Sequence, residues 1–378
     1  MRRFICLVSV LSLLLQSAFA QMPSWHAVQS EAFPVEDVSL CESVSVGDQV
    51  LFYGSKGASA VDAEDPNAAP WNDAFAALMP LGEKEPWIYT YNTTLPGGTA
   101  KFMGGAILEE QILLLKSVAD MYAEENFSVT VLDHAGELIC EHALPAEFRP
   151  VASCASSHML ILSGFRFDKG LRYPALMAYG TDGDILWQFV LKEHAELDPA
   201  RLNTYSRIAC DDESIWVQWE NAGSSSALHH FSAQGALLSE LPFSPSRFYA
   251  NEILICGEYV MVRGGEQHLP FVLYMFDPVI NNWRILRTPL DENEYDRCAF
   301  SDGNKVHFVT QLNQQPCRLF TFDPSAYSMD EAYFTPGDLY TDISYGCILQ
   351  DRQMLLCGLT KNDALPETPC YSLWKQEP

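Results

Sequence analysis

Four arginines recur along the chain beside aromatic residues, each shortly before an apolar strand segment. Guanidinium forks pair well with carboxylate or phosphate groups, and aromatic neighbours suit stacking on a planar ligand. A converging set of this kind would bind an anionic or carbohydrate ligand, such as a sugar acid. The candidate binding residues are Arg149, Arg207, Arg247 and Arg297, together with Tyr205, Tyr295 and Tyr340.

A second interpretation of the same arginines is structural, because acids occur in the same connections. The arginines would then pair with loop carboxylates, for which the candidates are Asp291, Glu292, Glu294 and Asp296. The opposite face is expected to be acidic, since the predicted hairpin turns carry Asp48, Glu109, Glu110, Asp211, Asp212, Glu213, Glu258, Asp302 and Asp351. Charged turns of this kind are interpreted as solvated surface.

Catalytic and metal-binding patterns are absent from the sequence. His229 and His230 are adjacent in a predicted strand and point apart, and Trp216 and Trp219 should lie on opposite faces of theirs. The acidic insertion at 56–72 lacks the ligand spacing and central glycine of an EF-hand loop. No C-x-x-C, G-x-S-x-G or P-loop occurs. No cofactor and no metal are therefore expected, and an enzymatic role is not favoured.

A sevenfold repeat of short apolar strands organises the chain. Their starts are separated by 45 to 62 positions, and they begin at Val50, Ile112, Met159, Ile215, Val260, Val306 and Met354. Each follows a polar turn and an earlier apolar strand, and most are followed by a second hairpin. About four antiparallel strands per unit, repeated radially, predict an all-β fold with one β-propeller of about seven four-stranded blades.

The two ends of the chain supply one further argument. The last unit contains three strand segments, Ile343–Leu349, Met354–Leu359 and Cys370–Lys375, whereas the start of the mature chain contributes one, Trp25–Ser30. The sequence therefore predicts that the N-terminal strand joins the last blade and closes the ring, because an unpaired sheet edge is unfavourable.

One unit resembles a kelch repeat, at about residues 259–287. It has a glycine pair at Gly264-Gly265, an aromatic residue and Asp at Phe276-Asp277, and Trp283 at the start of a fourth strand. The second to fourth units look more like WD40-like or quinoprotein-like blades, as in Tyr179–Trp187. The resemblance implies a propeller fold and does not by itself imply an activity.

Cys347 and Cys357 are the candidate disulfide. They are equally distant from residue 352 in a predicted tight hairpin, so they would face each other on adjacent strands. An even number of cysteines after the first twenty residues permits disulfides in an exported chain.

Residues 1–20 have the pattern of a secretory signal. Arg2 and Arg3 precede an apolar stretch, and Ala18-Phe19-Ala20 precedes the expected cleavage after Ala20. Residues 21–378 would then form the propeller, secreted or otherwise outside the cytoplasm and without a membrane span. The formal charge of −26 disfavours nucleic acid as a partner.

These observations together predict an exported, monomeric binding or scaffold module. Its partner would be a protein or an anionic or carbohydrate ligand at the channel mouth. The alternative is a propeller enzyme, either a polysaccharide lyase or glycosidase, or an oxidoreductase. An enzyme would need converging acid, base or metal groups at the channel mouth, whereas a scaffold would not.

Overall fold

The structure is a computed structural model that describes residues 25–32, 38–47, 49–57, 71–80, 86–95, 97–120, 125–194, 196–197, 205–220, 227–243, 248–266, 269–286, 294–312, 317–334, 342–349, 353–360 and 368–376. The predicted signal at 1–20 lies outside these ranges. Strands dominate the described part, whose one helical element is the 3-10 turn η1 (Lys192–His194), so none of its helices could cross a membrane. The prediction of an all-β protein is confirmed.

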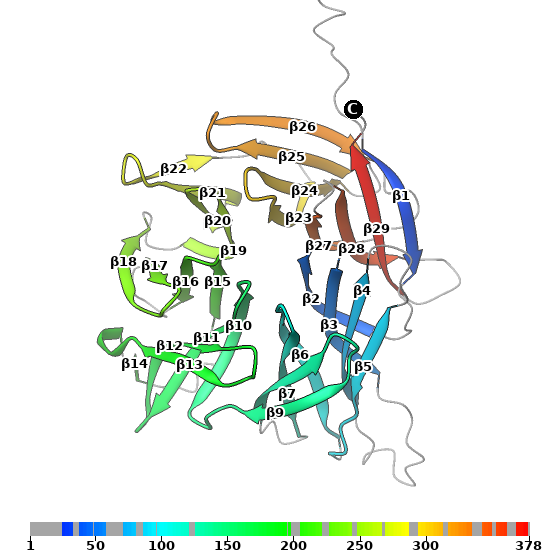
Figure 1. Cartoon of the computed structure of the whole chain (residues 1–378). Helices are drawn as coiled ribbons and strands as arrows, with labels where there is room; N and C mark the ends of the chain where they lie inside the picture. The colour runs from blue at the N-terminus through cyan, green and yellow to red at the C-terminus, as the bar shows by residue number, and fades with distance from the viewer. Residues whose placement is uncertain are drawn as a thin grey trace, which may run out of the picture.

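The strands form seven antiparallel units of four strands, arranged about a common centre (Figure 1). The first unit has β2 (Val38–Val46), β3 (Gln49–Gly57), β4 (Asn72–Pro80) and β5 (Trp87–Tyr91). The second has β6 (Thr99–Ile107), β7 (Gln111–Ala119), β8 (Glu125–Asp133) and β9 (Leu138–Ala143). One parallel bridge between Asn72 and Thr99 joins these two units into a single sheet.

The other units follow the same order along the chain. The third has β10 (Phe148–Ala155), β11 (Leu160–Asp168), β12 (Leu171–Tyr179), β13 (Ile185–Val190) and a short β14 (Glu196–Leu197). The fourth has β15 (Tyr205–Cys210), β16 (Ser214–Glu220), β17 (Ala227–Ser232) and β18 (Leu237–Pro242). The fifth has β19 (Phe248–Cys256), β20 (Tyr259–Glu266), β21 (Leu269–Asp277) and β22 (Asn282–Leu286). The sixth has β23 (Glu294–Ser301), β24 (Val306–Leu312), β25 (Cys317–Asp323) and β26 (Ser328–Phe334).

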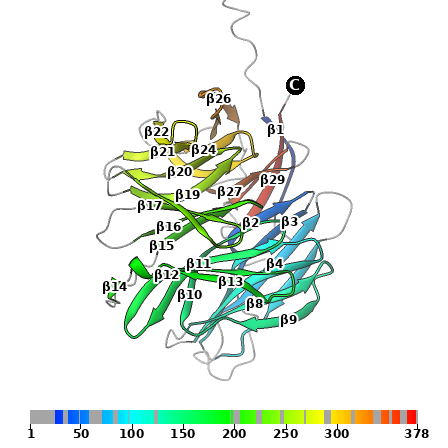
Figure 2. The same ribbon diagram turned by 60° about the vertical axis from the view of Figure 1, so that its left-hand side comes forward.

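The seventh unit combines the two ends of the chain. It contains β27 (Asp342–Ile348), β28 (Met354–Thr360) and β29 (Thr368–Gln376), and β1 (Trp25–Ala32) pairs antiparallel with β29. The register runs from Trp25 opposite Gln376 to Ala32 opposite Cys370, and both views show the two strands side by side (Figures 1 and 2). The strand pairing predicted for the N-terminal segment is therefore present.

Position in a unit determines how apolar each strand is. The second strands are buried on both faces, because neighbouring units pack against each face of the sheet. In β7 the run Ile112–Lys116 is buried throughout, whereas β9 at the perimeter alternates exposed and half-buried residues. This is why the second strands read as continuous apolar runs and the fourth strands as alternating ones.

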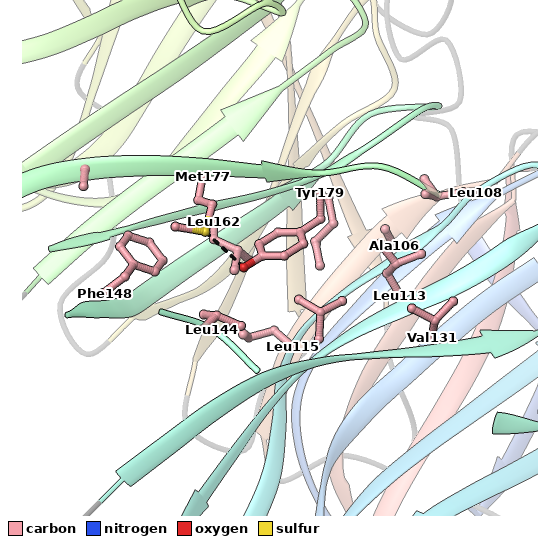
Figure 3. Close-up of a cluster of buried hydrophobic side chains, with 13 residues drawn as sticks. Ala106, Leu108, Leu113, Leu115, Val131, Leu144, Phe148, Leu162, Met177 and Tyr179 are labelled. Carbon is pink, nitrogen blue, oxygen red and sulfur yellow. Dashed lines mark hydrogen bonds between the residues drawn. The ribbon is translucent and has the colours of Figure 1, made fainter. Parts of the chain in front are cut away.

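The core is a series of clusters between adjacent units. The cluster between the second and third units is shown in Figure 3, where Leu113, Leu115 and Leu162 pack around Tyr179. The Tyr179 hydroxyl donates to Met177 Sδ over 3.0 Å, and burial raises the pKa of Tyr179 to about 12. Such interlocking clusters tie each unit to its neighbours, so no unit has an independent core.

Outer aromatic residues also bridge successive units. Trp87 Nε1 donates to the His134 carbonyl of the second unit, and Trp187 Nε1 donates to the Ala233 carbonyl of the fourth, each over 3.0 Å. The indoles lie on Gly136 and Gly235, where an added Cβ would come within 2.7 and 2.6 Å of the ring. Both glycines have positive φ, so the turn and the close approach of the indole each require glycine.

A β-bulge interrupts the innermost strand in six of the seven units. The bulged residues are Cys41, Met103, Val151, Asn251, Arg297 and Ser344, whereas β15 pairs with β16 in unbroken register. A bulge adds one residue to one strand and redirects the side chains around it. The bulges therefore decide which inner-strand residues point toward their neighbours.

The expected Cys347–Cys357 disulfide is contradicted by this register. Cys347 is opposite Leu355 and Cys357 is opposite Tyr345, because the hairpin is centred on residue 351 and not on residue 352. Neither residue forms a disulfide in the structure. Burial, with smaller contributions from Cys347, Cys370 and Cys298, raises the pKa of Cys357 well above its usual value.

Candidate functional site

Three arginines of the predicted rim lie within inner strands and not in the connections that precede them. Arg149 is the second residue of β10, Arg207 the third of β15, and Arg297 the bulged residue of β23. The three residues lie at different distances from the ends of their strands, so their backbones stand at different levels of the inner strands. Arg247 and Tyr340 lie outside the described residues, and Tyr205 is described only in its backbone.

The described rim residues make contacts with neighbouring groups of the chain. Arg149 Nη2 lies 2.7 Å from Glu125 Oε2, and Arg207 Nε donates to the Asn251 carbonyl over 2.6 Å. Arg297 lies over the ring of Tyr295, 5.6 Å from its centroid, and Tyr295 is exposed. The carboxylate Glu294, a predicted partner of these arginines, instead pairs with Arg318. An anionic ligand at this rim remains a prediction.

Two carboxylates near Arg207 were not anticipated from the sequence. Glu42 in β2 and Glu252 in β19 each follow a bulge, and they occupy equivalent positions opposite Tyr53 and Arg263. Tyr53 donates its hydroxyl hydrogen to Glu42 over 3.1 Å, and Arg263 Nε lies 3.0 Å from Glu252 Oε2. In the sequence, the available signal was a glutamate that directly follows the bulged residue in two inner strands. This repetition can be recognised only when the register of those strands is known.

The pKa of Glu42 is influenced by charged residues of two other units. Burial is the main cause of its raised pKa, the hydrogen bond from Tyr53 opposes it, and the charges of Glu252 and Arg207 act in opposite directions. The first, fourth and fifth units thus contribute charges that influence one another near the centre of the ring. Coupled carboxylates with a raised pKa occur in functional sites and in structural networks alike.

A groove of about 660 Å³ opens between the fourth and fifth units, on the face that carries the inner hairpin turns. This is the face that the sequence predicted to be acidic. The groove is lined by Asp211, Glu213, Ser214, Trp216, His230, Ser239, Leu241, Ile255, Gly257, Glu258, Val260, Phe276, Pro278, Val279 and Asn281. Its volume lies in the range of pockets that take small ligands or several side chains.

The wall of the groove is an aromatic stack. Trp216 in β16 and His230 in β17 are cross-strand partners, with ring centroids 3.8 Å apart and planes within 2° of parallel. Trp219 and His229 pack together on the other face of the sheet. The prediction that Trp216 and Trp219 point to opposite faces, and that His229 and His230 do so too, is therefore confirmed. Burial lowers the pKa of His230, although Asp211 opposes the shift, so His230 is neutral at pH 7.

The mouth of the groove is acidic and partly apolar. Asp211, Glu213 and Glu258 are exposed in hairpin turns, and neither lysine nor arginine is among those lining residues that the structure describes. Val279, 80% exposed, stands at the rim beside Pro278. The groove therefore offers negative potential, aromatic surface and an apolar lip in one place, a combination suited to a cation carried on an apolar stem.

Comparisons with known proteins identify the fold. No protein-family model and no curated protein matches the chain. The β-propeller domain of the Trilobed protease from Pyrococcus furiosus aligns with TM-score 0.55 and 14% identity, over 90% of this chain and 97% of that one. An acylaminoacyl peptidase from Pyrococcus horikoshii aligns with TM-score 0.54 and 13% identity, over 88% and 50%.

A third similar structure does not come from a peptidase. A chain of the Mitotic Checkpoint Complex aligns with TM-score 0.54 and 9% identity, over 94% of this chain and 94% of that one. The protein thus has a β-propeller fold, resembling both peptidase propellers and a WD40-type propeller. At these identities the likeness shows the fold alone, and a kelch relationship of the fifth unit remains a prediction.

Proposed function

We propose that this chain is an exported, closed seven-bladed propeller that acts as a binding module for another protein. The groove between the fourth and fifth units takes a lysine or arginine side chain of that partner. The observation that carries the proposal is one groove of about 660 Å³ that combines three exposed carboxylates with an aromatic and apolar wall, and whose described lining includes neither lysine nor arginine.

Contacts between the ends of the chain support a closed ring. The first and seventh units share one apolar cluster, in which Val50 and Phe52 pack with Leu355 and Leu373. Each innermost strand contacts the innermost strand of the next unit, and β27 contacts β2. The related Pyrococcus furiosus propeller is described as having an open velcro topology, whereas β1 is hydrogen-bonded to β29 in this chain.

Charge and surface chemistry favour a cationic side chain as the occupant of the groove. A chain of formal charge −26 attracts basic partners, and the groove concentrates that attraction beside Trp216. The methylene stem of a lysine or arginine can pack on Phe276 and Val279 while its charged end reaches Glu213 or Glu258. An anionic ligand would meet like charges at this mouth.

The first test compares charge reversal at the groove with the same charge reversal at an inner hairpin turn of another unit. The double substitution Glu213→Lys/Glu258→Lys should weaken binding of a lysine-rich heptapeptide roughly tenfold, since each exposed pair contributes about 0.5–1 kcal/mol. The matched control, Glu109→Lys/Glu110→Lys, changes the net charge equally in the exposed β6–β7 turn. Isothermal titration or fluorescence anisotropy at several salt concentrations measures both.

The outcomes separate the groove from the overall charge. Equal weakening by the two double variants would show that the peptide responds only to net charge, and the proposed groove would be wrong. Preference for a glutamate-rich heptapeptide over the lysine-rich one would instead favour the arginine rim. Trp216 is not used for this test, because it is buried and its replacement would disturb the core between the fourth and fifth units.

A further inference from the structure

The junction between the third and fourth units brings two thiols together. Cys154 is the penultimate residue of β10 and Cys210 the last residue of β15, and these two innermost strands are in contact. Both side chains are half-buried and pack against the same apolar cluster, and the Cys210 thiol contributes to the raised pKa of Cys154. The two sulfurs are therefore neighbours although 56 positions separate them in the chain.

Polar contacts on either side hold this junction in place. At the turns, Ser157 donates to Asp212 Oδ1 through its backbone N over 2.8 Å and through its Oγ over 2.6 Å. Further along the strands, Ser163 Oγ and Ser206 Oγ are 2.5 Å apart. Cys210 lies between Ser206 and Asp212 in the chain, and Cys154 lies between Ser157 and Ala152, the residue of β10 opposite Ser163. The two contacts therefore flank the cysteines on both sides.

The corresponding contacts at two other junctions each contain one thiol and one hydroxyl. The Ser301 hydroxyl at the end of β23 acts to lower the pKa of Cys256 at the end of β19, and Ser45 in β2 acts in the same way on Cys347 in β27. The chain thus repeats a small polar contact between innermost strands. Of these three junctions, the one between the third and fourth units has a sulfur on both sides.

We propose that Cys154 and Cys210 are an oxidation site, at which a disulfide joins the innermost strands of the third and fourth units. The oxidant is a small-molecule disulfide such as oxidised glutathione. The Cys154 thiolate attacks it and releases one glutathione, and the Cys210 thiolate then attacks the mixed disulfide and releases the second. Two electrons pass to glutathione, two thiol protons are lost from the protein, and one S–S bond forms.

The environment of the pair predicts how fast this reaction proceeds. Burial, reinforced by the neighbouring Cys210 thiol and by Glu42, raises the pKa of Cys154 well above its usual value. The thiolate is the attacking species, so oxidation should be slow at pH 7 and faster as the pH rises toward that pKa. Once formed, the bond closes a long loop and should be stabilising.

The test uses the full chain, incubated with oxidised glutathione at pH 8.5 and then alkylated without reductant. Peptide mapping should give one linked peptide pair containing Cys154 and Cys210, and oxidation should raise the melting temperature by about 5 °C. Cys210→Ser should abolish both effects. The matched control is Cys256→Ser, at the junction between the fifth and sixth units, where the thiol has a hydroxyl and not a second thiol beside it; this variant should retain both effects.

Two results would overturn the proposal. One is alkylation of both cysteines, or a stable mixed disulfide with glutathione, after complete exposure to the oxidant. The other is a melting temperature that rises on oxidation of Cys210→Ser as much as in the unaltered chain. Should Cys210→Ser fold poorly, peptide mapping of the unaltered chain still decides the question.

Discussion

Deletion of residues 21–35, which contain β1, is expected to lower the melting temperature by about 10 °C or more, or to abolish cooperative unfolding. The deletion removes the hydrogen-bonded partner of β29 along seven residue pairs. It leaves a free sheet edge beside strand residues Tyr371, Leu373 and Trp374, whose side chains belong to the core clusters of the seventh unit. Open edges of this length favour aggregation.

Differential scanning calorimetry, with light scattering to follow aggregation, measures the effect. Deletion of residues 21–24 alone is the control, because it stops before β1. Proline substitutions refine the test: successive residues of an edge strand direct their N–H groups to opposite sides, so only one of Ser30→Pro and Glu31→Pro removes a bond to β29. Unchanged melting temperatures in the deletion and in both proline variants would contradict ring closure through β1.

The repeat made much of the fold predictable from the sequence. Short apolar runs separated by polar turns gave the hairpins, and counting strands at the two ends gave the β1–β29 pair. These inferences depend on local chemistry, namely turn residues and continuous apolar strands, which each unit displays separately. The opposite directions of Trp216 and Trp219 followed from the same two-residue period.

The register of the innermost strands could not be predicted from the sequence pattern. A bulge shifts every later side chain by one position, and nothing in the local composition around Val151, Asn251 or Arg297 announces it. The expected Cys347–Cys357 facing pair failed for a simpler reason, because the turn is centred on residue 351 and Cys347 therefore lies opposite Leu355. The depths of Arg149, Arg207 and Arg297 were likewise unpredictable, because they depend on where each inner strand begins and bulges.

Contacts between units were the other information missing from the pattern. The thiols Cys154 and Cys210 are separated by the same 56 positions as the repeat starts Met159 and Ile215. That coincidence was an available signal, but its meaning depends on innermost strands of successive units lying side by side. The groove at Trp216 similarly combines turns from two units, so neither unit reveals it alone.

A buried ion pair in the sixth unit provides the second large expected effect. Glu294 opens β23 and accepts from Arg318 of β25, with Arg318 Nη1 2.8 Å from Glu294 Oε2, and the side chains are 0% and 7% exposed. Thr310 donates to the same carboxylate, and Arg318 Nε lies 2.9 Å from Glu331 Oε1. The two buried charges therefore depend on each other for compensation.

Arg318→Met is expected to destabilise the protein by about 3–5 kcal/mol, because it leaves the Glu294 carboxylate buried without its cation. The double substitution Glu294→Leu/Arg318→Met should recover most of that loss, since it removes both charges and keeps a comparable apolar volume. Arg166→Met is the control, because its 3.4 Å pair with Glu147 is exposed and should contribute at most about 1 kcal/mol. Urea unfolding at pH 7 measures all three. A double variant no more stable than Arg318→Met would show that Glu294 and Arg318 act through packing and not through their mutual charge compensation.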